Sequence, residues 1–90
     1  MRIEHDTTAE HPVFTLDLRG FRLERALEEL ERQIDRAIMS NMRSFEVIHG
    51  HGEGVLRNGV HDRLRRHPAV REYEFAAPEE GGFGKTIVRL

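Results

Sequence analysis

The chain has 90 residues, the size of one domain with a single core, and its 38% hydrophobic and 33% charged residues are typical of a globular domain. It has no cysteine, which excludes disulfides, a thiolate zinc site and a cysteine nucleophile, and no apolar run approaches the roughly 20 residues that span a bilayer. The net charge of −2 is unevenly distributed, with an acid-rich segment at 26–35 and an arginine-rich segment at 47–71.

Residues 1–12 are polar and without periodicity, and we expect them to form a flexible arm or linker before a domain at 13–90. They contain no signal-peptide core, so a cytoplasmic location is expected. Residues 13–18 alternate between apolar and polar side chains, which predicts a strand. Between 21 and 38 the apolar residues recur every three or four positions, which predicts a helix that ends near Ser40.

A second strand is predicted at 44–49, followed by a glycine-rich turn at 50–54. Apolar residues at helical spacing from Val55 to Leu64 predict a second helix, weakened by Asn58-Gly59 and ending near His67-Pro68. Two further strands are predicted at 71–76 and 85–90, joined by a loop.

This order, βαβαββ, predicts an α/β fold of two layers with a four-stranded mixed sheet. A strand–helix–strand unit implies that the first two strands pair in parallel through a right-handed crossover. The last two strands are close enough in sequence to form an antiparallel hairpin. Several strands alternate, so the helices should cover one face only. Tyr73, Phe75 and Phe83 are expected to belong to the core.

Three segments, 16–20, 48–54 and 81–86, combine glycines with charged or titratable side chains. The first two follow parallel strands and precede helices. The carboxyl ends of adjacent parallel strands bring such loops together, and helix N-termini there offer free N–H groups to anions. We therefore expect a phosphate-sized site formed by Asp17, Arg19, His49 and His51.

Other interpretations of these residues remain open. The glycines at 50–54 match neither a Walker loop nor a dinucleotide fingerprint, so they form either a tight turn or a backbone cradle for an oxyanion. His49 and His51, with His61 and Asp17, are chemically suited to a metal, yet two histidines separated by one residue point opposite ways on a strand. Asp17 is equally suited to capping the helix that follows.

Taken together, the three segments resemble the Smr (small MutS-related) domain family. That family has a Leu-Asp-x-His-Gly motif after its first strand, a His-Gly-x-Gly motif after its second, and a glycine-rich approach to its last strand. In this sequence the three read Leu16-Asp17-Leu18-Arg19-Gly20, His49-Gly50-His51-Gly52 and Gly81-Gly82-Phe83-Gly84-Lys85-Thr86.

The resemblance covers 13–90 and implies a fold similar to the C-terminal domain of bacterial translation initiation factor three. It is strongest to the Smr domain at the C-terminal end of the second bacterial MutS paralogue, which implies a MutS-like ATPase portion in cis, joined through the arm. The family's activities are endonucleolytic, so the resemblance implies DNA or RNA, and in some members the ribosome, as partners, and recombination suppression or stalled-ribosome rescue as roles. No membrane partner is expected.

The motif histidine of the family is replaced here by Arg19, which can clamp a phosphate but cannot exchange a proton. We therefore assign catalysis to Asp17, Arg19 and His49, with His49 as the acid–base group and Asp17 orienting it, activating water or holding an ion. The expected nucleic-acid contacts are Arg19, Gly50, His51, Gly52, Gly54, Arg57 and Lys85. No cofactor is required by this assignment, and a divalent ion (Mg or Mn) is compatible with it.

These residues lead to one main hypothesis, a nucleic-acid-binding Smr domain with weak endonuclease (nicking) activity. The alternative is a non-catalytic module that binds nucleic acid or the ribosome, with Arg19 marking the loss of chemistry. A structural domain whose glycines serve only as turns is a third possibility. The sequence leaves open DNA against RNA, metal dependence and oligomeric state.

Overall fold

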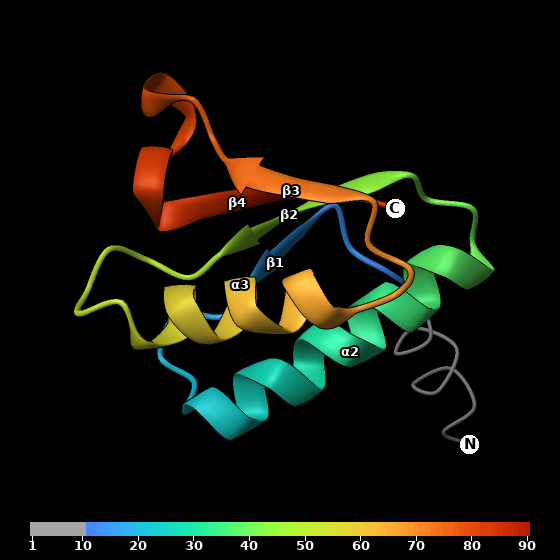
Figure 1. Cartoon of the computed structure of the whole chain (residues 1–90), viewed down its shortest axis with the longest axis horizontal. Coiled ribbons are helices and arrows are strands. Elements are labelled where there is room, and N and C mark those ends of the chain that lie inside the picture. Colours follow the sequence, from blue (N-terminus) through green and yellow to red (C-terminus); the bar gives the residue numbers. More distant parts are fainter. Residues whose placement is uncertain (1–10) are drawn as a thin grey trace, which may run out of the picture.

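The computed structural model describes residues 11–90, and Figure 1 shows its elements in chain order. They are β1 (Thr15–Asp17), α2 (Leu23–Met39), β2 (Ser44–Ile48), α3 (Val55–Arg66), β3 (Glu72–Phe75), the short 3₁₀ turns η1 (Pro78–Glu80) and η2 (Gly82–Gly84), and β4 (Lys85–Arg89). This order confirms the predicted βαβαββ arrangement. Of the arm expected at 1–12, residues 1–10 lie outside the described part of the chain.

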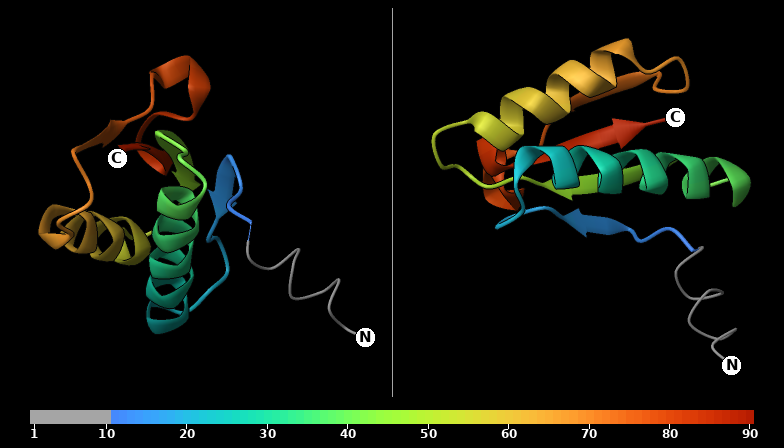
Figure 2. Two further views of the ribbon diagram at one scale, coloured as in Figure 1. Left: turned by 90° about the vertical axis from the view of Figure 1, so that its right-hand side faces the viewer. Right: turned by 90° about the horizontal axis from the view of Figure 1, so that it is seen from below.

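The four strands form one mixed sheet in the order β1-β2-β4-β3. Strands β1 and β2 are parallel, connected through α2, whereas β4 is antiparallel to both β2 and β3. Both helices lie on one face of the sheet, which leaves the other face open (Figures 1 and 2). The parallel pair, the terminal hairpin and the two-layer architecture were all predicted correctly.

The core lies between the sheet and the two helices. Alternate residues of β2 and β4 face inward, while α2 and α3 each contribute one apolar stripe. The fully or almost fully buried members are Leu18, Ala26, Leu30, Ile34, Ala37, Phe45, Val47, Val60, Leu64 and Val88. Burying each leucine or isoleucine side chain stabilises the fold by about 1.5–3 kcal/mol. Within residues 11–90, neither helix has the length and apolar composition needed to cross a bilayer.

The segment before β1 is held in place by Gln33, a side chain of α2. Gln33 is almost completely buried, and its amide accepts a hydrogen bond from the Val13 N–H (3.1 Å) and donates one to the Val13 carbonyl (2.6 Å). These two bonds hold the segment that leads into β1 against the helix layer.

Helix α3 is continuous through Gly59, the residue that the sequence marks as its weak point. The helix continues through this residue to Arg66, and a Cβ atom at Gly59 would lie only 2.4 Å from Cδ1 of Leu23. The glycine therefore permits the close approach of α3 to the first turn of α2.

The prediction that Phe83 belongs to the core is wrong. Tyr73 and Phe75 are half-buried, but Phe83 is 66% exposed, because it sits in the 3₁₀ turn η2 outside the sheet. The alternation that places Tyr73 and Phe75 does not extend to a residue that precedes β4.

Candidate nucleic-acid interface

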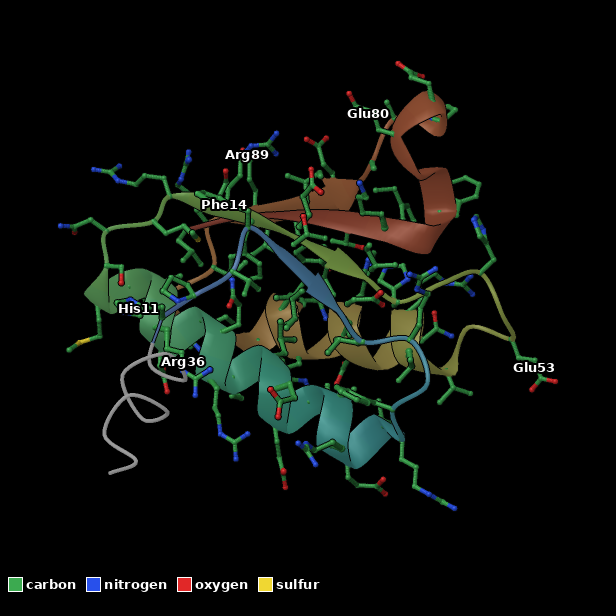
Figure 3. All side chains as sticks on the ribbon, turned by 180° about the vertical axis from the view of Figure 1, so that it is seen from behind. His11, Phe14, Arg36, Glu53, Glu80 and Arg89 are labelled. Carbon is green, nitrogen blue, oxygen red and sulfur yellow. The ribbon has the colours of Figure 1, made fainter. Side chains whose placement is uncertain are left out.

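The structure brings the three glycine-containing segments together at one edge of the molecule. Because β1 and β2 are parallel, their ends are adjacent, and the Leu18 N–H donates to the Ile48 carbonyl (2.8 Å). The turn before β4 joins them: the Gly84 carbonyl accepts from the N–H groups of both His49 (3.1 Å) and Gly50 (2.9 Å). In Figure 3, Glu53 marks the tip of the glycine loop and Glu80 the tip of the β3–β4 connection.

Asp17 and Arg19 form a closed pair at the end of β1. The Arg19 Nε and Nη2 groups donate to the two carboxylate oxygens of Asp17 at 2.9 and 2.7 Å, and the Arg19 backbone N–H donates at 3.0 Å. These bonds lower the pKa of Asp17 to about 2, so its carboxylate is ionised and weakly basic. The guanidinium stays largely exposed, and its remaining N–H donors are available to a phosphate.

His49 is directed inward, toward the helix layer. It is only 5% exposed; its Nε2 lies 2.8 Å from Oγ1 of Thr86, and its Nδ1 lies 3.2 Å from the Gly50 carbonyl. The expectation that Asp17 orients His49 is therefore wrong: Asp17 is on the other side of the strand pair and bonds to Arg19. The alternation along β2 places His49 on the same face as Val47, whereas Asp17 lies on the open face.

Thr86 joins His49 to a second histidine. Its Oγ1 also lies 2.6 Å from Nε2 of His61 on α3, and we refer to His49, Thr86 and His61 as the His–Thr–His chain. A carbonyl only accepts, so Nδ1 of His49 carries the proton that faces Gly50. Nε2 of His49 then accepts from the Thr86 hydroxyl, which in turn accepts from the His61 N–H. This set of protons gives both ring nitrogens of His49, the Thr86 hydroxyl and Nε2 of His61 a hydrogen-bond partner.

Both imidazoles of the His–Thr–His chain are neutral at neutral pH. Burial is the main cause that lowers the pKa of His49, and the charge of Arg57 lowers it further. Burial also lowers the pKa of His61, with added effects from His49 and Arg57. Burial disfavours the charged form, so protonating either ring in place costs stability.

The glycine loop encloses a cleft of about 250 Å³ between β2 and the start of α3, lined by residues 49–57. Gly50 and Gly54 have φ angles of 81° and 90°, which other residues rarely adopt. The first N–H groups of α3 have no partner within the helix, and the Arg57 guanidinium lies over Gly54, where a Cβ atom would come within 2.3 Å of it. Gly52 has neither constraint: its φ angle is not in the left-handed region, and a Cβ atom there would meet nothing within 4 Å.

A second cleft, of about 310 Å³, adjoins the first and is lined by Arg19, His51 and Lys85, together with Gly84 and Glu80. The His51 ring packs over Gly84, where a Cβ atom would lie 2.8 Å from its Nε2. Lys85 faces Glu46 at 3.1 Å, so this cation, like Arg19, already has a carboxylate beside it. The predicted contact residues thus line two connected clefts.

A resident metal ion does not fit these residues. Among the described side chains, no three His, Asp or Glu groups gather closely enough to hold one. Nε2 of both His49 and His61 bonds to Thr86, and both oxygens of Asp17 bond to Arg19.

Sequence reasoning missed Thr86 and placed His61 only in a hypothetical metal cluster. Thr86 is fully buried beside Val47 in the antiparallel pairing of β2 with β4. Its position two residues before Val88, on the inward face of β4, was a signal for burial. The contact with His61 depends on how α3 packs on the sheet, which no local pattern specifies.

The two-layer fold and the glycine-edged clefts define a small α/β domain of the Smr type, and a profile of the Smr domain matches residues 16–90. The chain belongs to the Smr domain family. It is similar in structure to the crystal structure of the Smr domain of Thermus thermophilus MutS2, with a TM-score of 0.84 and 36% identity over 87% of this chain and 98% of that one. It is also similar to YdaL, a stand-alone small MutS-related protein from Escherichia coli, with a TM-score of 0.81 and 25% identity over 93% of this chain and 70% of that one.

Relatives in sequence carry the name Endonuclease MutS2. The chain is 47% identical over 83% of its length to the protein of Staphylococcus epidermidis, and 46% identical over 93% to that of Streptococcus thermophilus. It spans only 10% and 11% of the lengths of these relatives.

Proposed function

We propose that this Smr domain binds nucleic acid through its phosphates and cleaves it as a weak endonuclease. The observation that carries the proposal is the position of His49, which lines a cleft edged by free helix N–H groups and Arg57. The N–H groups and cations stabilise the charge that develops on a phosphate under attack. The neighbouring cleft, with Arg19 and Lys85, holds the adjoining phosphates.

The His–Thr–His chain gives His49 a role as the proton donor. The Nδ1 proton of His49 passes to the leaving oxygen, while Nε2 takes up the Thr86 proton. Thr86 is reprotonated by His61, and His61 takes a proton from solvent, so neither imidazole becomes an anion. We assign uptake of the nucleophile's proton to His51, an assignment supported by its exposure and its position in the lining of both clefts.

The wider setting belongs to the same proposal. The domain acts on DNA or RNA as part of a larger MutS-like ATPase, in the cytoplasm, in recombination suppression or stalled-ribosome rescue. The names of the relatives support an endonuclease attached to a MutS-type protein.

The second candidate function is binding without cleavage. It is favoured by the resting geometry, in which both ring nitrogens of His49 are engaged and the Asp17 carboxylate is held by Arg19. On this hypothesis the clefts bind phosphate, and the buried histidines only stabilise the fold.

Single-turnover cleavage and binding by His49→Ala distinguish the two functions. We expect cleavage of labelled branched DNA or structured RNA to fall at least about a hundredfold, the low end of acid–base catalysis. Affinity should change less than about fivefold, as for one modest hydrogen bond. The matched control is His67→Ala, because His67 lies at the end of α3, where it faces Glu31. Parallel reactions with and without Mg²⁺ or Mn²⁺ determine any need for a divalent ion.

Each result of this experiment selects one hypothesis. Folded His49→Ala that cleaves like the parent chain would contradict the catalytic role of His49. A parent chain that binds nucleic acid but does not cleave it would favour the binding-only function. A chain that binds neither DNA nor RNA at low salt would refute both.

A further inference from the structure

Phe83 is an aromatic side chain that the fold presents to solvent. It lies in η2 between Gly82 and Gly84, and it is 66% exposed although large apolar side chains normally face the core. A Cβ atom at Gly82 would have nothing within 4 Å, so the turn is also open to solvent at the residue before Phe83. The ring is therefore accessible to a ligand.

The position of the ring is nevertheless fixed. Phe75 packs against it edge to face, with centroids 4.9 Å apart and ring planes at 73°, and His61 packs behind Phe75 at 4.8 Å. The turn itself is closed by the Gly84 N–H, which donates to the Gly81 carbonyl (3.0 Å). A held ring loses little conformational freedom when it binds a ligand.

The surroundings of Phe83 determine which ligand suits it. The next residue, Gly84, lines the cleft that contains Arg19, His51 and Lys85. An exposed apolar ring one residue away from the lining of a cleft with cationic side chains matches the two parts of a nucleotide, the flat base and its charged phosphate. Glu80 also lines this cleft and repels phosphate, so a bound strand must place its phosphates against Arg19 and His51 rather than beside Glu80.

We infer that Phe83 stacks on an unpaired base of the bound nucleic acid, next to the phosphates held in the clefts. This inference rests on the proposed function and narrows its substrate class. Within an intact duplex both faces of a base are covered by its neighbours, so only single strands, loops, flaps and branch points can offer a free face. The domain is thereby selective for nucleic acid with unpaired nucleotides.

The chain contains no tryptophan, so Phe83→Trp introduces a single fluorescent reporter at the stacking position. We expect a short single-stranded oligonucleotide to quench it strongly, and the same strand in a blunt duplex to quench it little. The matched control is Phe14→Trp, because Phe14 is 79% exposed and precedes β1, at the opposite end of that strand from Asp17 (Figure 3). Its fluorescence should not respond to either probe.

Affinity measured by fluorescence anisotropy of the labelled oligonucleotide provides the second readout. Phe83→Ala should weaken binding of the single strand about tenfold, as for the loss of one stacked base, and leave duplex binding unchanged. Phe83→Leu, which keeps the apolar character but lacks a flat ring, should lose most of the same affinity.

The two readouts separate failure of this inference from failure of the proposed function. Binding of the single strand without quenching at position 83, or with equal affinity for Phe83→Ala, would overturn the stacking role alone. Absence of any binding by the parent chain would overturn the proposed function and this inference with it.

Discussion

Replacing Thr86 by valine tests whether the His–Thr–His chain is a real element of the fold. Valine has the same shape and an equal preference for strands, so β4 should keep its backbone. What is lost is one hydroxyl, which lies 2.8 Å from His49 and 2.6 Å from His61. The residue is completely buried, so water cannot replace the missing group without opening the core.

The magnitude follows from these two contacts. Each hydrogen bond contributes about 1 kcal/mol net, and a ring nitrogen left buried without a partner adds about 1 kcal/mol more, so Thr86→Val should lower the free energy of unfolding by about 3 kcal/mol. Thr86→Ser keeps the hydroxyl and loses one methyl, which costs about 1 kcal/mol. Urea unfolding at pH 7.5, followed by circular dichroism, measures both differences.

The relative stability of the two variants shows whether the hydroxyl of Thr86 holds the two imidazoles. If Thr86→Val is as stable as the parent chain, or more stable than Thr86→Ser, the hydroxyl does not hold the two imidazoles together. The role of His61 in returning a proton to His49 would then have no physical basis.

Two further predictions concern pH and salt. Burial lowers the pKa of both histidines of the chain below the ordinary 6.5, so the unfolded state binds protons more tightly, and stability should be constant above about pH 7 and fall as the pH drops below 6.5. Equal urea midpoints at pH 7.5 and 5.5 would contradict this expectation. Three cations line the clefts, namely Arg19, Arg57 and Lys85. The logarithm of the association constant for duplex DNA, plotted against the logarithm of the salt concentration, should therefore have a slope of about −2.7. Arg19→Ala should make the slope shallower by about 0.9, whereas Arg43→Ala, at the residue before β2, should leave it unchanged.

The fold could be predicted from the sequence because its signals are local. Alternation identified β2 and the terminal hairpin, and the apolar stripe of α2 gave both its extent and its buried face. Element ends were less predictable: β1 is only three residues long, because pairing with β2 begins at Thr15. The packing role of Gly59 could not be predicted, because it depends on the contact with Leu23 of another helix.

The sequence predicted which loops form the candidate site, but the predicted contacts between their side chains were wrong. The meeting of the loops at 17–19 and 49–54 follows from parallel strand ends, which topology alone determines. The direction of each side chain does not follow from that topology. Asp17 and His49 end neighbouring strands on opposite faces, so they do not meet, while His49 reaches His61, a residue of α3 that is paired with it only by helix packing.

Under the proposed function, the charges of the clefts bear on how the domain finds its substrate. Arg19 faces Asp17 and Lys85 faces Glu46, so a phosphate must compete with a carboxylate at both positions. The Arg19–Asp17 pair is exposed and the Lys85–Glu46 pair is half-buried, and together they leave the clefts with little net positive charge to attract nucleic acid over a distance. Affinity must then come from short-range contacts, namely the helix N–H groups and the phenyl ring of Phe83. A domain that binds weakly by itself gains most from attachment to a larger nucleic-acid-binding protein, because attachment raises its effective concentration at the substrate.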